Sequence, residues 1–282
     1  MRNKIVAFYK LMRLDKPIGI FLLLWPTLWA LFLASNALPD LKLLSIFIAG
    51  AVLMRSAGCV INDYFDRKID PQVQRTKNRQ IGLGNVTLYE VFFIVLALSL
   101  TSFILVLQLN LLSIQVAFIA LLFVISYPLT KRFFCMPQLY LGITFGFGIL
   151  IAYSAVQNQI PSQAFLLFAA NIFWAIAYDS HYAVSDMTDD KALNIYSVPL
   201  TFKGLTIKII FISYLSMFFI LYVIGFIEQF SYQYYLALLI AIFIALYNCN
   251  LSKKLNSEKN FKAFLLNNYL GCFIFLGFLS QT

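Results

Sequence analysis

The chain has 282 residues, of which 61% are hydrophobic and only 12% are charged. About a quarter of residues are charged in soluble globular domains, and apolar runs recur here to the C-terminus, so the composition excludes a soluble enzyme and a mature secreted domain behind one signal peptide. The formal net charge is +9, but the basic residues lie in short segments between apolar runs. This placement indicates membrane topology and no nucleic-acid partner.

Nine apolar runs of about 20 residues follow one another, which is the length that a helix needs to cross a bilayer. They begin near Ile18, Leu43, Leu88, Leu111, Pro137, Gln163, Ile209, Tyr234 and Phe264. Continuous runs of this length indicate helices, because barrel strands are shorter and alternate in polarity. The sequence therefore predicts an all-α integral membrane protein, with one domain over residues 1–282 and nine transmembrane helices in a bundle.

The positions of the basic residues predict the orientation of these spans. Nineteen of the 21 Lys and Arg residues lie before the first span, after the eighth, or between spans two and three, four and five, or six and seven. These segments are on one side if all nine spans cross. Since cytoplasmic segments are enriched in Lys and Arg, we expect a cytoplasmic N-terminus and a C-terminus on the opposite side.

Polar side chains gather where spans two, four and six return to that side. The first group is NDYFDRKID, the second is SYPLTKR, and the third is YDSHYAVSDMTDD. Their candidate site residues are Asn62, Asp63, Asp66, Arg67 and Asp70; Tyr127, Lys131 and Arg132; and Asp179, Asp186, Asp189 and Asp190. One acidic cluster alone is readily explained as a solvated helix end. Two clusters on the same side favour a shared site.

The spacing of the acids predicts what such a site would hold. Asp63, Asp66 and Asp70 are spaced i, i+3, i+7, and Asp186 and Asp190 are spaced i, i+4, so each set projects from one helix face. Ligands that are all oxygen favour a hard cation, and Mg²⁺ commonly shares its coordination shell with phosphates. We therefore expect Mg²⁺-bound pyrophosphate between two acidic helix ends.

The remaining polar residues have weaker signals. Lys131, Arg132 and Arg67 either anchor topology or neutralise phosphate oxygens. Arg55 lies inside an apolar run, where an unpaired cation is costly, so it should face a polar cavity or a carboxylate. The lone histidine, His181, lies on a different helix face from Asp186 and is not expected to act as an acid or base. The four scattered cysteines lack metal-ligand spacing.

These motifs resemble those of the UbiA-type intramembrane aromatic prenyltransferases. The resemblance runs over nearly the whole chain, through RLDKPIG, LLLWPTLWAL, RSAGCVINDYFDRKID, RTKNR, YPLTKR, WAIAYDSHYAVSDMTDD and FKAFLLNNY. The pattern N-D-x-x-D-x-x-x-D with a second Asp-rich motif is specific to the superfamily. RLDKPIG and AGCVINDY are similar to the branch that acts on 4-hydroxybenzoate.

The resemblance implies a nine-helix bundle around a central cavity open toward lipid, with two Asp motifs facing each other over Mg²⁺ and a prenyl diphosphate. Asn62, Asp63, Asp66 and Asp70 match the first motif, and Asp186, Asp189 and Asp190 match the second. Tyr127 and Lys131 match a Tyr-x-x-x-Lys element beside the diphosphate, where Arg67 and Arg132 match basic positions. The implied reaction joins a polyprenyl group to 4-hydroxybenzoate in ubiquinone biosynthesis, with Asp66, Asp186, Lys131 and Arg67 catalytic. The resemblance also implies a bacterial inner-membrane location with the active site on the cytoplasmic side, and it implies no obligate protein partner.

Two departures and three alternatives stay open. Asn194 stands where the family commonly has Gly, and Gln80 stands where Pro is usual after RTKNR, so closure of the cytoplasmic loops or substrate preference could differ. Either Arg13 or Arg55 would hold the acceptor's carboxylate. The acceptor could instead be dihydroxynaphthoate, homogentisate or haem. A cation-coupled transporter is a different class, but it would place polar residues at mid-membrane.

Overall fold

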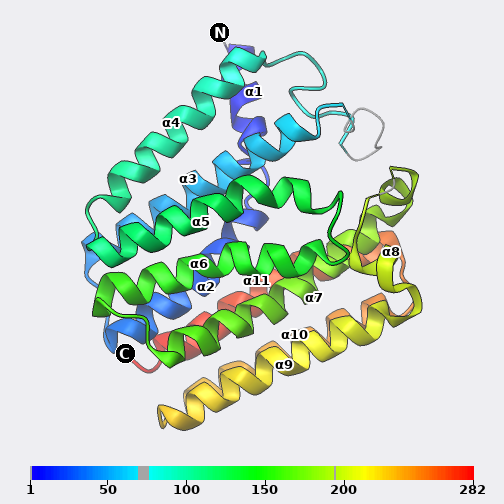
Figure 1. Ribbon diagram of the computed structural model, residues 1–282. Coiled ribbons are helices and arrows are strands. Elements are labelled where there is room, and N and C mark those ends of the chain that lie inside the picture. The colour runs from blue at the N-terminus through cyan, green and yellow to red at the C-terminus, as the bar shows by residue number, and fades with distance from the viewer. Residues whose placement is uncertain (1, 69–75, 194) are drawn as a thin grey trace.

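The computed structural model describes residues 2–68, 76–193 and 195–282 (Figure 1). In this part of the chain all regular elements are helices: α1 (Arg2–Leu11), α2 (Ile18–Ser35), α3 (Leu41–Phe65), α4 (Leu88–Val106), α5 (Leu111–Thr130), α6 (Pro137–Gln157), α7 (Ser162–Ala192), α8 (Val198–Phe202), α9 (Thr206–Ile227), α10 (Tyr232–Ser252) and α11 (Ser257–Leu279). A 3₁₀ turn at Lys203–Leu205 joins α8 to α9. The predicted all-α membrane fold is confirmed.

Eight helices in the described part are long and apolar enough to cross a membrane. The 31-residue α7 is not among them, because Asn171, Asp179 and His181 interrupt its apolar sequence. The predicted ninth span and the predicted orientation of the N-terminus therefore stay predictions.

Polar side chains mark several helix starts. Thr87 and Glu90 form a capping box at α4, in which the Thr87 side chain accepts from the Glu90 backbone N–H and Glu90 accepts from that of Thr87. Asn110 and Asn256 cap α5 and α11 by accepting backbone N–H groups. These caps satisfy donors that apolar surroundings would leave unpaired.

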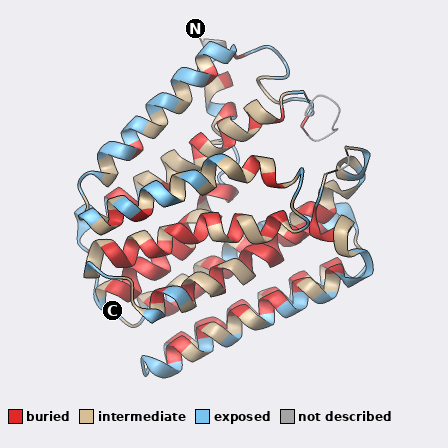
Figure 2. Cartoon of the chain, viewed as in Figure 1, coloured by how far each residue is buried: buried red, intermediate tan, exposed pale blue. Residues whose placement is uncertain are grey.

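The most buried helices are α2, α6 and α7, which lie in the middle of the molecule (Figure 2). Trp29 of α2 and Trp174 of α7 are fully buried, with ring centroids 5.0 Å apart. Gly271 of α11 permits this pairing, because a Cβ there would lie 2.6 Å from the Trp174 ring. Indole N–H groups need acceptors when buried. Trp29 donates to the Gly271 carbonyl at 3.0 Å, and Trp174 donates to Asn267 at 2.9 Å.

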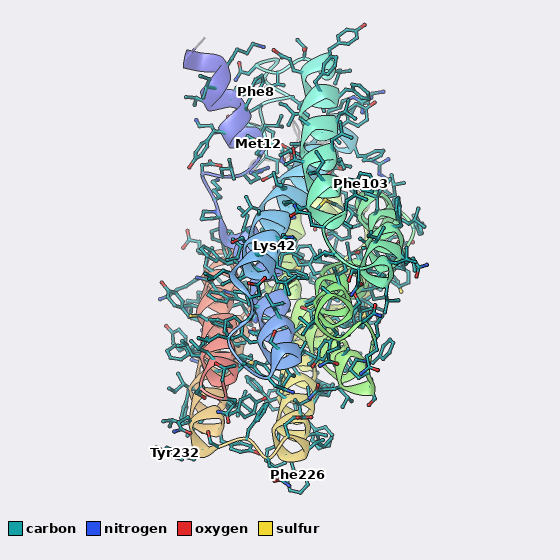
Figure 3. The ribbon with its side chains drawn as sticks, turned by 90° about the vertical axis from the view of Figure 1, so that its left-hand side faces the viewer. Phe8, Met12, Lys42, Phe103, Phe226 and Tyr232 are labelled. Carbon is teal, nitrogen blue, oxygen red and sulfur yellow. The ribbon has the colours of Figure 1, made fainter. Side chains whose placement is uncertain are left out.

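The helix ends fall on two sides of the bundle. The ends of α3, α5 and α7 lie on the right-hand side in Figure 1, together with α8. The opposite side is turned toward the viewer in Figure 3, where Lys42 lies at the start of α3 and Phe226 and Tyr232 lie at the turn between α9 and α10. The helix α1 stands beside α4 and buries Ala7 and Leu11 in a small apolar cluster.

Candidate active site

A cavity of about 870 Å³ lies inside the bundle. Residues of α2 to α7 and α11 line it. Its polar end is formed by the ends of α3, α5 and α7, and its walls continue through apolar residues as far as Leu109 and Ile114 beside the α4–α5 turn. The cavity therefore joins a charged region at one end of the bundle to a long apolar region.

The acids of α3 are buried at the polar end. Asp63 is 3% exposed and Asp66 is 2% exposed. Arg79 Nη1 lies 2.9 Å from Asp63 Oδ1, and Arg13 Nη2 lies 3.5 Å from the same oxygen. Lys131, directly after α5, forms an ion pair with Asp66. Buried charges require such partners. The geometry thus places three cations around two carboxylates in one cavity.

The acids of α7 reach the same cavity from the facing side. Asp186 and Asp190, one turn apart, both line it, and so does Asp179 two turns earlier. Ser257 at the start of α11 donates to the Ser185 carbonyl at 2.9 Å, which fixes this part of α7. Asp189 is not in the cavity lining. Of the predicted metal ligands, Asp70 lies outside the described residues, as does the departure at Asn194.

The donor set at this end fits a hard cation. Among the described residues, no three His, Cys, Asp or Glu side chains are close enough together to hold a metal ion alone. Asp66 Oδ1, however, is buried without a hydrogen-bond partner in the described structure, and Asp186 and Asp190 line the same space. Carboxylate oxygens shared between two helices suit Mg²⁺ that keeps phosphate oxygens in its shell.

Arg55 is also in the cavity wall, on α3. Its Nε is buried without a hydrogen-bond partner in the described structure, and its guanidinium lies 5.6 Å from the centre of the Phe145 ring. Gly19 makes room for it, because a Cβ at Gly19 would lie 2.4 Å from Arg55 Nε. The cation is held against aromatic and backbone surfaces and leaves a donor available to a ligand.

The other predicted basic residues lie differently. Arg67 is not in the cavity lining; its guanidinium donates to the Tyr64 carbonyl at 2.8 Å and lies 4.4 Å from the centre of the Tyr64 ring. Arg132 donates to the Phe65 carbonyl at 3.1 Å, with Nη2 3.8 Å from Asp66 Oδ1. Each therefore lies beside the acidic end of α3 without reaching into the cavity.

Arg79 lines the cavity, although the sequence does not predict it as a site residue. Its segment, RTKNR, contributes to the sequence analysis only through the resemblance and the departure at Gln80. Arg79 is also only 12% exposed in its side chain, and a basic residue in a loop gives no sequence signal of such burial.

Asn62 and Tyr127 line the cavity near the acids. The Tyr196 N–H donates to the Lys131 carbonyl at 2.7 Å, which joins the segment after α7 to the end of α5. His181, by contrast, is fully buried between helices, where Nδ1 contacts Ser252 Oγ at 2.7 Å and Asn260 Oδ1 at 3.3 Å. These contacts hold α7 against α10 and α11, and His181 is not in the cavity lining.

Comparison with known proteins shows what the chain is similar to. The model of the UbiA prenyltransferase family matches residues 23–275. A 4-hydroxybenzoate octaprenyltransferase from Methylobacillus flagellatus is 49% identical over 281 residues, which cover 100% of this chain and 95% of the relative. One from Thiobacillus denitrificans is 47% identical over 277 residues, covering 98% and 94%.

Solved structures share the fold. A UbiA homologue from Aeropyrum pernix has a TM-score of 0.81 at 21% identity, over 92% of this chain and 97% of that chain. A UbiA homologue from Archaeoglobus fulgidus bound to GPP and Mg²⁺ has a TM-score of 0.77 at 14% identity, over 98% and 99%. The family match over most of the chain, together with relatives close to half identical along its length, shows that this protein belongs to the UbiA prenyltransferase family.

Proposed function

We propose that the protein transfers a polyprenyl group from polyprenyl diphosphate to the ring carbon ortho to the hydroxyl of 4-hydroxybenzoate. The product, 3-polyprenyl-4-hydroxybenzoate, belongs to ubiquinone biosynthesis. One observation carries the proposal: two acidic helix ends and partly buried cations meet in a cavity whose other walls are apolar. Full-length relatives named 4-hydroxybenzoate octaprenyltransferase support it and suggest an octaprenyl donor.

The polar end is suited to a diphosphate. Lys131 and Arg79 place positive charge inside the cavity, and Lys is a point charge while Arg offers a fork of donors for phosphate oxygens. As the carbon–oxygen bond of the donor breaks, negative charge grows on the leaving group, and fixed cations stabilise that charge. Arg67 and Arg132 are proposed as further contacts at the rim.

Asp63, Asp66, Asp186 and Asp190 are proposed to hold Mg²⁺, with Asp70 and Asp189 completing the two motifs. Bound there, the metal would act as a Lewis acid toward the leaving diphosphate. Asn62, Tyr127 and Asp179 are proposed to orient the substrates beside these acids.

The acceptor is proposed to bind through Arg55. Its buried, unpartnered Nε suits the carboxylate of 4-hydroxybenzoate, whereas Arg13 already contacts Asp63. The electron-rich ring then attacks the allylic cation of the donor through the carbon ortho to the hydroxyl, and loss of the ring proton restores aromaticity. Apolar walls keep water from the cation, which would otherwise give a prenol.

The test uses purified protein in lipid, 4-hydroxybenzoate and prenyl diphosphates of several lengths, with product identified by mass spectrometry. We expect prenylated acid with Mg²⁺ and none with EDTA. Asp66→Asn should abolish turnover while the protein stays folded and inserted. Near-normal turnover in that variant would remove the metal-clamp proposal, and product only with another aromatic acceptor would overturn the substrate assignment.

The cytoplasmic side is proposed for the site because most Lys and Arg residues lie at that end. Cys135 reports on this, since it is exposed in the segment between α5 and α6, while Cys59 is buried. A membrane-impermeant maleimide should label the protein in inverted vesicles and not in intact spheroplasts, and Cys135→Ser should remove the label. Labelling in spheroplasts alone would place the site on the outer side.

A further inference from the structure

A second hollow, of about 510 Å³, lies between α9 and α10. None of the residues that line it lines the active-site cavity. Although α9 and α10 are consecutive, α9 packs mainly on α7 and α10 mainly on α11. The two helices therefore leave a groove between them, toward the ends that lie away from the Phe226–Tyr232 turn seen in Figure 3.

The walls of this groove are apolar and exposed. Phe211 and Ile212 of α9 are 47% and 56% exposed, and Leu246 of α10 is 50% exposed. A protein in water rarely exposes such a patch, whereas in a bilayer the same surface contacts acyl chains. The apolar part of the groove is thus suited to hydrocarbon.

Two lysines complete the groove at one end. Lys208 lies in the first turn of α9 and Lys253 directly follows α10, so both are at the end of the bundle that carries the active site. Neither forms an ion pair with another described side chain. Positive charge at the polar end of an apolar groove complements an amphiphile with an anionic head.

We propose that this groove binds an anionic glycerophospholipid, with its acyl chains against Phe211, Ile212 and Leu246 and its phosphate on Lys208 and Lys253. The polyprenyl diphosphate donor is also an anionic amphiphile, but the groove is separate from the cavity in which its diphosphate would react. The bound lipid fills the space between two helices that contact each other little, and so stabilises the packing of α9 beside α10.

General membrane anchoring by lysine makes a different prediction from a built site. Lys203 lies five residues before Lys208, and Lys254 directly follows Lys253. Both are exposed, but neither lines the groove. Anchoring predicts equal effects of all four. A site predicts that only Lys208 and Lys253 select the lipid headgroup, so Lys203→Ala/Lys254→Ala is the matched control for Lys208→Ala/Lys253→Ala.

The experiment is native mass spectrometry of the full-length protein with phosphatidylglycerol and phosphatidylcholine, with thermal unfolding measured on the same samples. We expect the wild type to retain phosphatidylglycerol preferentially and to unfold at a higher temperature with it. Lys208→Ala/Lys253→Ala should weaken its binding by about fivefold per lysine, so roughly 25-fold in all. The control pair and Lys208→Arg/Lys253→Arg should retain it.

Three results would overturn the proposal: equal retention of the two lipids by the wild type, equal losses in both alanine pairs, or displacement of phosphatidylglycerol by geranyl diphosphate. Should the alanine pair fail to fold, Ile212→Trp narrows the groove with both lysines present. That variant should also lose preferential binding, and full retention by a folded Ile212→Trp protein would contradict the site.

Discussion

The two sides of the active-site cavity differ in how much of their helices is buried inside the protein. The inner wall is formed by α2, α6 and α7. In the most apolar stretches of α2 and α6, 67% and 61% of the residues are buried inside the protein. The outer wall, α4 and α5, is only 11% and 22% buried. Figure 2 shows the contrast between the central helices and α4. A firm wall can hold reacting groups in place, and a wall with few contacts can yield to a long lipid substrate.

Lys131 links the two walls, because it follows the outer-wall helix α5 and yet pairs with the buried Asp66. Lys131→Met should lower kcat by about 100- to 1,000-fold, because the variant loses the fixed positive charge that would stabilise the leaving diphosphate. Steady-state kinetics with a fixed donor measure this.

A loss of folding is separated from a loss of catalysis by a second variant. Lys131→Met leaves Asp66 short of a partner, whereas Asp66→Asn/Lys131→Met removes both charges. We expect the double variant to regain thermal stability and stay inactive. Turnover close to that of the wild type in either variant would show that Lys131 supplies no catalytic charge.

Gly19, on the inner-wall helix α2, lies against the Arg55 side chain of α3. Gly19→Ala should force the Arg55 side chain to move, because the new Cβ would lie 2.4 Å from Nε. A charged hydrogen bond contributes about 1.5–3 kcal/mol, so KM for 4-hydroxybenzoate should rise roughly 10- to 100-fold with a smaller change in kcat.

Gly50→Ala is the matched control, since Gly50 also lines the cavity on α3 but a Cβ there meets nothing within 4 Å. Its KM should equal that of the wild type. Equal KM values for the two variants would mean that Arg55 does not bind the acceptor.

The smallest expected effect concerns stability alone. Asn267 accepts from Trp174 Nε1 and from the Tyr214 hydroxyl, each at 2.9 Å. Asn267→Leu leaves both buried donors without this acceptor and should lower the free energy of unfolding by about 1–3 kcal/mol. Phe93→Ala on α4 removes a side chain that is 63% exposed and should change it by less than about 0.5 kcal/mol. Thermal unfolding in one lipid mixture compares them. Equal losses would contradict the expectation that the contacts of Trp174, on the inner wall, stabilise the protein more than the exposed face of α4.

The length of the apolar runs predicts most of this fold, because a lipid environment requires each run to satisfy its own backbone hydrogen bonds. The runs expected from Ile18, Leu88, Leu111 and Pro137 begin at those residues as helices. The run expected near Phe264 begins at Ser257, seven residues earlier. The first turns of this helix are polar, so hydropathy does not detect them. The helix begins earlier because the Asn256 side chain caps its start.

The site was predictable only as far as local spacing reaches. Spacing put Asp63 and Asp66 on one face, and both line the cavity. It could not show that Arg79 folds back onto Asp63, because that contact depends on the path of a loop. Nor could it show that Arg67 turns toward Tyr64, since the choice between a diphosphate and an aromatic ring depends on tertiary packing.

The exposure of α4 and α5 affects how a hydrophobic molecule could leave the cavity. A molecule that leaves the cavity past these helices enters the bilayer directly, so its search for the next enzyme is two-dimensional. Solubility in water then places no limit on the length of the hydrocarbon tail. With an exposed outer wall of α4 and α5, the membrane can therefore serve as the compartment in which the lipid substrate arrives, reacts and leaves as product.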